Sequence, residues 1–265
     1  LVDLGDPYSG YNRSIPISSF LPPLLAELGL PTVIHGLDSV SPKYGLTHRH
    51  INQALGLSVD HSTAEAKARI ENTSIGWSYV DQKSYCKGLH DMVPLRDRVI
   101  KRTVINTVET LIGPLRGKTT HSILGYVHKP YPPIYAHLVK ASGMDTALLV
   151  RGVEGGVVPS LRQKGLMISY QGTKEQDRVD IDPSSIGIDQ DMRAISFPGE
   201  MDVKSDIKDL AEYTVKLGRS ALSGEQGMFY DGLVLSASLI LWHTKKSDSL
   251  ADAAKIVRST LDSGK

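Results

Sequence analysis

Three consecutive segments decide the fold: SILGYV at residues 122–127, PPIYAHLVKA at 132–141 and TALLV at 146–150. The first and third are short apolar runs that suit buried strands. The middle segment has apolar residues at helical spacing, and its two prolines suit a first helical turn. Two strands joined by a helix form a parallel βαβ unit. The sequence therefore predicts an α/β protein with a mostly parallel central sheet flanked by helices.

The alternation of strands and helices continues on both sides of this unit. We expect strands at residues 1–4, 31–35, 166–171 and 194–197, with the acidic stretch 177–191 between the last two. We expect helices at residues 19–28, 47–55, 62–71, 82–111 (interrupted near Pro94), 206–222, 228–243 and 250–261, the last capped by Ser247 or Asp248. Ligands of parallel sheets lie beyond the C-terminal ends of the strands. The loops that begin at Gly5, His35, Gly125 and Arg151 are therefore candidate binding loops.

Length and composition exclude several classes of protein. With 265 residues and a single cysteine, Cys86, the chain is neither a disulfide scaffold nor a multi-cysteine zinc protein. The longest apolar run, residues 233–242, is too short to cross a bilayer, and no signal peptide is visible. We expect a protein with no membrane partner that is not secreted, in the cytoplasm or an organelle matrix such as the plastid stroma.

The net charge of +1 conceals an uneven distribution. Residues 86–165 carry 12 Lys and Arg against 5 Asp and Glu, a net +7, whereas residues 1–85 and 166–265 are net acidic. A basic middle segment is a candidate anion-binding surface, although such charges also line ordinary solvated helix faces. The spacing of Arg98, Lys101 and Arg102 would place them with Arg96 on one cationic helix face.

Residues 76–96, GWSYVDQKSYCKGLHDMVPLR, resemble in ungapped register the stretch G-F-T-F-L-F-A-P-x-Y-H-P-A-M-x-x-V-x-P-V-R of anthranilate phosphoribosyltransferases. RTVIN at 102–106 and GPL at 113–115 continue the match, which extends over nearly all 265 residues. The wider family includes pyrimidine nucleoside phosphorylases. Residues 150–163, VRGVEGGVVPSLRQ, resemble a divergent subgroup with some nucleic-acid-binding members.

This resemblance implies one α/β domain over 1–265, with 82–111 partly in a small helical lobe whose preceding N-terminal helical domain we expect to be missing. It also implies a homodimer. The implied activity is the Mg²⁺-dependent transfer of a phosphoribosyl group from phosphoribosyl pyrophosphate to anthranilate, a step of tryptophan biosynthesis.

The resemblance also assigns site residues. The two phosphate loops map onto residues 3–14 and 34–45, and the metal pair G-[IM]-D-E onto residues 152–155, where one carboxylate remains. Phosphate-binding candidates are Gly5, Asp6, His35, Gly36, Ser41 and Lys43, and the weak metal candidate is Glu154. Candidates for binding the acceptor or another anion are Arg96, Lys101, Arg102, Arg151 and Arg162. Glu154 could equally pair with Arg151 or Arg162, Arg96 could cap a helix or pair with Asp91, and Gly155-Gly156 could form a backbone anion nest.

Departures from the family pattern divide the functional prediction. The phosphate-binding lysine is Ile34, the asparagine is Leu37, the arginine is Asp38, and the second metal carboxylate is Gly155. One reading is a binding protein on this fold that holds a phosphate-rich ligand, such as nucleic acid, in a basic cleft. The alternative is an active, Mg²⁺-dependent pentosyltransferase that uses phosphoribosyl pyrophosphate or another phosphorylated molecule with anthranilate or a different acceptor.

Overall fold

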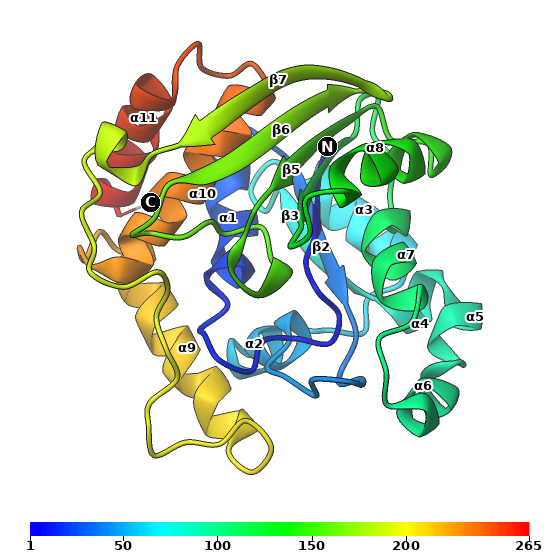
Figure 1. Cartoon of the computed structure of the whole chain (residues 1–265). Coiled ribbons are helices and arrows are strands. Elements are labelled where there is room, and N and C mark those ends of the chain that lie inside the picture. Colours follow the sequence, from blue (N-terminus) through cyan, green and yellow to red (C-terminus); the bar gives the residue numbers. More distant parts are fainter. Residues whose placement is uncertain (265) are drawn as a thin grey trace.

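A single seven-stranded sheet, in the order β3-β2-β1-β4-β5-β6-β7, runs through the computed structural model, which describes residues 1–264 (Figure 1). Neighbouring strands among the first five are parallel, and the last two form an antiparallel hairpin at one edge. Their bounds are β1 Val2–Gly5, β2 Thr32–Gly36, β3 Trp77–Asp81, β4 His121–Gly125, β5 Thr146–Val150, β6 Gly165–Gln171 and β7 Lys174–Ile181. The predicted fold class is confirmed.

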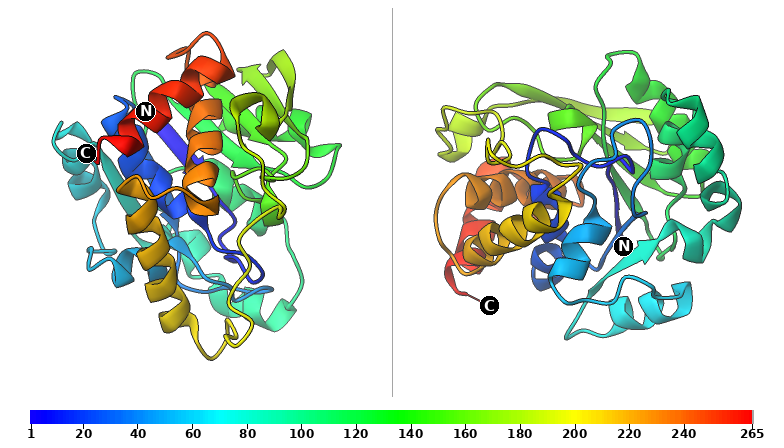
Figure 2. Two further views of the ribbon diagram at one scale, coloured as in Figure 1. Left: turned by 90° about the vertical axis from the view of Figure 1, so that its left-hand side faces the viewer. Right: turned by 90° about the horizontal axis from the view of Figure 1, so that it is seen from below.

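Helices cover both faces of this sheet. Their bounds are α1 Leu21–Glu27, α2 His48–Ala54, α3 Thr63–Glu71, α4 Gln82–Tyr85, α5 Lys87–His90, α6 Val93–Val99, α7 Ile105–Ile112, α8 Tyr131–Ala141, α9 Ile207–Leu222, α10 Met228–His243 and α11 Leu250–Asp262. Two further views show α9, α10 and α11 grouped on one side of the sheet and α7 and α8 on the other (Figure 2).

Alternation along the strands explains the two-sided burial. Leu148 and Val150 of β5 pack in the larger core with α1, α9, α10 and α11, whereas Ala147 and Leu149 pack in a second core with α7 and α8. A parallel strand buried on both faces reads as a continuous apolar run, as TALLV does. Within α10 all but three of the sixteen residues are buried. Across residues 1–264, no helix combines the length and the apolar character that crossing a membrane requires.

Helix starts follow the capping chemistry of the sequence. Thr47 and Ser62 are the N-caps of α2 and α3, and both form capping boxes. The last helix differs, because Ser249 is its N-cap and accepts a hydrogen bond from the Asp252 amide, in place of Ser247 or Asp248. Pro94 lies in the first turn of α6, where its missing N–H costs little. In place of the long helix expected at 82–111, the structure has four short helices, α4 to α7.

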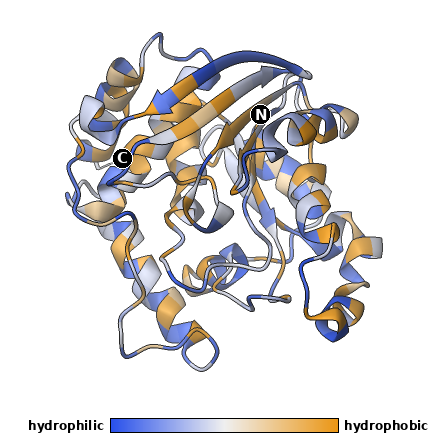
Figure 3. Ribbon diagram, viewed as in Figure 1, coloured by the Kyte–Doolittle hydropathy of each residue, from blue (hydrophilic) through white to orange (hydrophobic). Residues whose placement is uncertain are grey.

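Two strands were not predicted, and one predicted strand is wrong. β3 has buried polar positions at Ser78 and Asp81 that obscure the apolar run. β7, KEQDRVDI, overlaps the start of the expected acidic stretch 177–191 and is hydrophilic over most of its length (Figure 3). Residues 194–197 form no strand and contribute only a single bridge, from Ser196 to Ser14.

Candidate anion-binding site

The loops after β1, β2 and β5 meet at the C-terminal edge of the parallel strands, as the topology requires. An ion pair joins them: the Lys43 ammonium lies 3.0 Å from a carboxylate oxygen of Glu154, and each side chain is 10% exposed. Lys43 also donates to the carbonyl oxygen of Gly10 at 3.2 Å. One lysine thus connects all three loops.

Glu154 is surrounded by donors from the first loop. Its carboxylate accepts hydrogen bonds from the Ser14 hydroxyl at 2.8 Å, the Arg13 amide at 3.0 Å and the Asn12 amide at 3.3 Å. Burial alone would raise the pKa of Glu154, but the charge of Lys43 and these donors lower it below its ordinary value. Its backbone is left-handed, with φ at 53°, a conformation that non-glycine residues seldom adopt.

This arrangement does not fit a magnesium ion. Mg²⁺ needs oxygen ligands that are free to coordinate it, and both oxygens of Glu154 already accept hydrogen bonds. Within residues 1–264 no group of three or more His, Cys, Asp or Glu side chains is placed to hold a metal. The expected pairing of Glu154 with Arg151 or Arg162 is replaced by the pairing with Lys43.

Asp6 is buried below this ion pair and acts as an anchor. It accepts hydrogen bonds from Tyr11, Ser18, His48 Nε2 at 3.0 Å and the Val157 amide at 2.8 Å. Burial would raise the pKa of Asp6, but its hydrogen bond to His48 and the other donors leave it lowered. The structure therefore places Asp6 as a support that ties the first loop to the third. Its neighbour Gly5 is packed so closely that an added Cβ would lie 2.4 Å from the Thr110 carbonyl oxygen.

His35 belongs to a buried polar chain. Its Nε2 lies 3.1 Å from a carboxylate oxygen of Asp3, its Nδ1 is hydrogen-bonded to the Tyr8 hydroxyl, and Tyr8 in turn contacts the Tyr85 hydroxyl. Both ring nitrogens are thus used inside the protein. Burial raises the pKa of Tyr8 well above its ordinary value, so Tyr8 stays protonated. Gly36, the next residue, is also buried.

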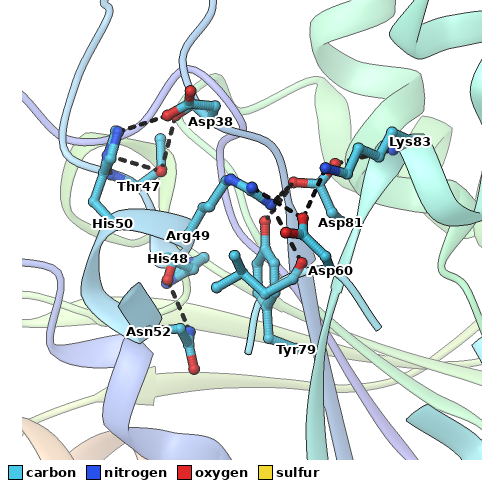
Figure 4. A network of polar contacts seen from close by, with 11 residues as sticks. Asp38, Thr47, His48, Arg49, His50, Asn52, Asp60, Tyr79, Asp81 and Lys83 are labelled. Atoms are coloured by element: carbon cyan, nitrogen blue, oxygen red, sulfur yellow. Dashed lines mark hydrogen bonds and ion pairs between the residues drawn. The ribbon is translucent and has the colours of Figure 1, made fainter. Parts of the chain in front are cut away.

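The second loop is fixed by polar contacts at its own ends. The hydroxyl of Ser41 donates to the carbonyl oxygen of Arg96 at 2.9 Å. Asp38 pairs with His50 at 2.8 Å, and this hydrogen bond lowers the pKa of the Asp38 carboxyl (Figure 4). Leu37 is buried in a small apolar cluster with Tyr8. Leu37, at the position of the family's asparagine, is therefore a core residue. Asp38, at the position of the family's arginine, is an exposed partner of His50.

A second ion-pair network holds the end of β3. Arg49 lies 2.9 Å from Asp81 and 3.0 Å from Asp60, and Asp60 also pairs with Lys83 at 2.7 Å (Figure 4). Tyr79 donates to Asp81 at 3.3 Å. This network fixes α2, which in turn carries His48 and His50 toward the first and second loops.

Arg96 is buried, with 1% of its surface exposed, and forms a bidentate pair with Glu109 at 2.6 and 2.9 Å. Burial raises the pKa of Glu109, and the Arg96 guanidinium opposes that rise. The alternative partner, Asp91, pairs with Lys87 at 2.7 Å. Placing Arg96 on a common cationic face is wrong, since Glu109 holds it in the interior.

The remaining predicted cations are exposed. Lys101 and Arg102 follow the end of α6 at Val99, and Ile100 is left-handed with φ at 60°, so these cations do not share a helix face with Arg98. Arg151 and Arg162 lie on the loop after β5, and neither has a carboxylate within 4.0 Å in the described part of the chain. The third loop packs against side chains of the first loop: a Cβ added to Gly156 would lie 1.8 Å from the Tyr11 hydroxyl, and one added to Gly155 would lie 3.9 Å from Pro7.

Two arginines of this region were missed by sequence reasoning. Arg13 and Arg193 line the same pocket as Arg151, at the ends of β4 and β5. Arg13 lies in the first phosphate loop, residues 3–14, so the sequence offered a signal for it. Arg193 lies in the net acidic segment 166–265, and no local pattern distinguishes it. Lys164, close to Arg162 in sequence, is paired with Asp182 at 2.8 Å.

With this geometry established, comparison with known proteins defines the class. The family model described as glycosyl transferase family, α/β domain, matches residues 10–265. The chain belongs to this family of glycosyltransferases. Its relatives include an uncharacterized protein of Aquifex aeolicus (26% identical over 252 residues, 95% of this chain and 71% of the relative). They also include the anthranilate phosphoribosyltransferase of Thermomicrobium roseum (25% over 257 residues, 96% and 69%).

Solved structures share the fold. The anthranilate phosphoribosyltransferase of Thermus thermophilus aligns with a TM-score of 0.72 at 19% identity, covering 99% of this chain and 72% of that one. The Saccharomyces cerevisiae enzyme, in complex with PRPP and Mg, aligns with a TM-score of 0.72 at 17% identity, covering 99% and 68%. The resemblance seen in the sequence is confirmed, and the chain spans about 70% of the length of these proteins.

Replacing Glu154 tests the ion pair. Glu154→Gln keeps the side-chain shape but leaves the Lys43 ammonium without its counter-charge, so we expect a loss of about 1–3 kcal/mol in the free energy of unfolding at pH 7. The pKa of Glu154 is lowered from 4.5, so the difference from wild type is full above pH 4.5 and disappears as the pH falls through the lower folded value.

Urea unfolding at pH 7 and pH 3 measures this difference. Glu27→Gln, at an exposed glutamate, is the matched control and should match wild type at both pH values. Equal stability of Glu154→Gln and wild type at pH 7 would contradict the assignment.

Arg96→Met leaves the Glu109 carboxylate buried and unpaired, and should destabilise the fold by about 3–5 kcal/mol. The double variant Arg96→Met/Glu109→Leu removes both charges and should recover part of that loss. Denaturant unfolding of Arg96→Met, Glu109→Leu and the double variant measures the coupling energy between the two side chains. Simple additivity of the two single effects would rule out a direct pair.

Proposed function

We propose that the chain binds a phosphate-rich polyanion, with nucleic acid as the expected class, and has lost phosphoribosyl transfer. One observation carries this proposal: groups at the positions of the family's phosphate, metal and acceptor residues are used inside the protein. Lys43 and Glu154 neutralise each other, and Arg96 is held by Glu109. A pyrophosphate, a metal ion or an acceptor carboxylate would have to displace these internal partners.

Exposed cations supply the binding surface. We call the following residues the basic surface: Arg98, Lys101, Arg102, Arg151 and Arg162. None of these five has a carboxylate oxygen within 4.0 Å among residues 1–264, so their charge is available to phosphate groups. Contacts of this kind bind the nucleic-acid backbone with little dependence on sequence and with strong dependence on salt.

An aromatic group stands near the basic surface. Tyr131 is 37% exposed, and its ring centroid lies 5.7 Å from that of His128 and 5.5 Å from that of Tyr135. Burial raises the pKa of Tyr135, and Arg102 is close enough to oppose that rise. Tyr131 is the exposed ring of this group, and an exposed aromatic ring is a platform on which single-stranded bases stack. This ring favours single-stranded over double-stranded nucleic acid.

The second candidate function is Mg²⁺-dependent pentosyl transfer. Family membership favours it, as does the yeast relative solved with PRPP and Mg. It would also use Lys43 and Glu154, a cation in the loop after β2 and a carboxylate in the loop after β5. It requires that the donor open the Lys43–Glu154 pair and that Glu154 exchange its hydrogen bonds for the metal.

Thermal shifts separate the two candidates. A saturating single-stranded oligonucleotide should raise the melting temperature, because a ligand at 100 times its Kd stabilises the native state by about 2.7 kcal/mol. Phosphoribosyl pyrophosphate with Mg²⁺, each at 5 mM, should give no shift beyond that of Mg²⁺ with pyrophosphate. A donor-specific shift together with ribosyl transfer to anthranilate would overturn the proposal in favour of the second candidate.

Salt dependence and substitution test the basic surface. If roughly four phosphates are contacted, affinity for a single strand should fall about 50-fold between 50 and 200 mM salt. The triple variant Arg98→Ala/Lys101→Ala/Arg102→Ala should weaken binding and flatten this slope. The control Lys208→Ala/Lys216→Ala/Arg219→Ala removes the same charge from exposed positions of α9 and should do neither. Equal effects of the two triple variants would show that only net charge matters.

The homodimer implied by the resemblance remains a prediction. The α6 region exposes four apolar side chains that could contribute to such a contact: Leu95, Val99, Ile100 and Val104. The cytoplasm or an organelle matrix likewise remains the predicted compartment.

A further inference from the structure

A chain of four polar side chains lies at the end of the sheet opposite the binding loops. Its members are His121, where β4 begins, Thr146, where β5 begins, Ser169 of β6, and His243, the last residue of α10. The Thr146 hydroxyl lies 2.8 Å from Nδ1 of His121 and 2.9 Å from Nε2 of His243. Nδ1 of His243 lies 3.0 Å from the Ser169 hydroxyl. These contacts tie the C-terminal end of α10 to three neighbouring strands.

Most of this polar chain is closed to water. The exposed fractions are 6% for His243, 8% for Thr146 and 7% for Ser169, and His121 is half-buried. The two imidazole rings meet edge to face, with their centroids 5.8 Å apart. None of the four residues lies in the loops after β1, β2 and β5, so the polar chain is separate from the site described above.

The Thr146 hydroxyl limits how many protons the two rings hold. It has one proton to donate, so it donates to one facing ring nitrogen and accepts from the N–H of the other. If both rings were charged, both facing nitrogens would be donors, and the hydroxyl proton would have no acceptor between them. Two like charges would also lie close together away from water, which disfavours the charged forms. The folded protein therefore accommodates at most one charged imidazole here.

The nearest charges do not compensate for an added proton. Neither imidazole has a carboxylate oxygen within 4.0 Å among residues 1–264. Burial lowers the pKa of His243 to about 3, and the charges of His121 and Lys245 act in the same direction. Burial and the amino group of Leu1 lower the pKa of His121, against an opposite effect of Asp145. Both rings are consequently held in the neutral form at pH 7.

The other elements around His243 supply no counter-charge in the described chain. In β7, Asp177 lies opposite Ser169 in the strand register but pairs with neither ring. The helices α1, α9 and α11 pack against α10, and their titratable side chains are exposed, apart from the half-buried Tyr213 and Arg258. A proton on His243 would therefore be an unpaired charge in the interior.

We propose that His121, Thr146 and His243 form an acid-released clasp, which holds α10 against the sheet while both imidazoles are neutral and weakens as acid favours their charged forms. In the unfolded chain both rings take up protons near their ordinary pKa of 6.5. Stabilisation by the clasp is thus complete above about pH 6.5 and is lost progressively as the pH falls toward about 3. The clasp does not depend on the proposed polyanion binding.

Urea unfolding of the full chain at pH 7 and pH 5 measures this linkage. One histidine whose pKa is 6.5 in the unfolded chain and about 3 in the folded chain raises the unfolding equilibrium constant about 25-fold over this interval. Both pH values lie above 4.5, the ordinary pKa of Glu154, so the titration of that carboxyl makes little difference between them.

Replacing His243 isolates its share of the pH dependence. His243→Gln keeps a hydrogen-bonding side chain that does not titrate, so its unfolding constant should rise at least tenfold less between pH 7 and pH 5 than that of wild type. The matched control is His137→Gln, at an exposed position of α8, which should keep the wild-type dependence. Equal pH dependence in His243→Gln and wild type would overturn the proposal.

NMR titration of the imidazole C–H resonances in folded wild type gives a second readout, which does not require any variant to fold. The His243 resonance should not move between pH 7 and pH 5, because the ring stays neutral over this interval. Titration of His243 near pH 6.5 in the folded protein, or two charged rings at pH 5, would show that the polar chain tolerates the protons and would refute the clasp.

Discussion

The ion pair between Lys43 and Glu154 is the contact on which the arrangement of the binding edge depends. It joins the loops after β1, β2 and β5, and Glu154 holds the first loop further through Ser14 and two backbone amides. Asp6 fixes the same loops from beneath, by accepting from His48 and the Val157 amide. In a fold shared with anthranilate phosphoribosyltransferases, this chain places opposite charges against each other at two positions that the sequence resemblance assigns to a phosphate and a metal.

Most of the fold could be predicted because apolar periodicity reports burial. The run TALLV and the uniformly apolar α10 are each explained by the sheet or helices that bury them on all sides. The wrong predictions, at β7 and at residues 194–197, arise where apolar periodicity does not report backbone pairing. β7 pairs through its backbone with β6 while its side chains are mostly exposed and charged, so periodicity gives no signal. Residues 194–197 are apolar because they cover the end of the core, and they make one bridge without extending the sheet.

The site could be predicted only in part. Sequence reasoning singled out the loops after β1, β2 and β5 and, within them, Lys43 and Glu154. It had no means of showing that these two side chains pair with each other, since they are far apart in the chain. The partner of Arg96 was missed because Glu109 lies on another short helix, α7, and only the fold brings α6 and α7 close enough for the two side chains to pair. Arg193 reaches its pocket from the stretch between β7 and α9, which carries no motif.

The central claim is that the chain's own ion pair fills the position that a ligand and its metal would occupy. Carbon-13 NMR titration of the Glu154 side-chain carboxyl, with and without Mg²⁺, tests it most directly. The account predicts that the pKa of Glu154 lies below its ordinary value of 4.5 and that the resonance does not move when millimolar Mg²⁺ is added at neutral pH. A pKa at or above 4.5, together with a saturable shift on adding Mg²⁺, would show a free carboxylate that holds metal and would contradict the account.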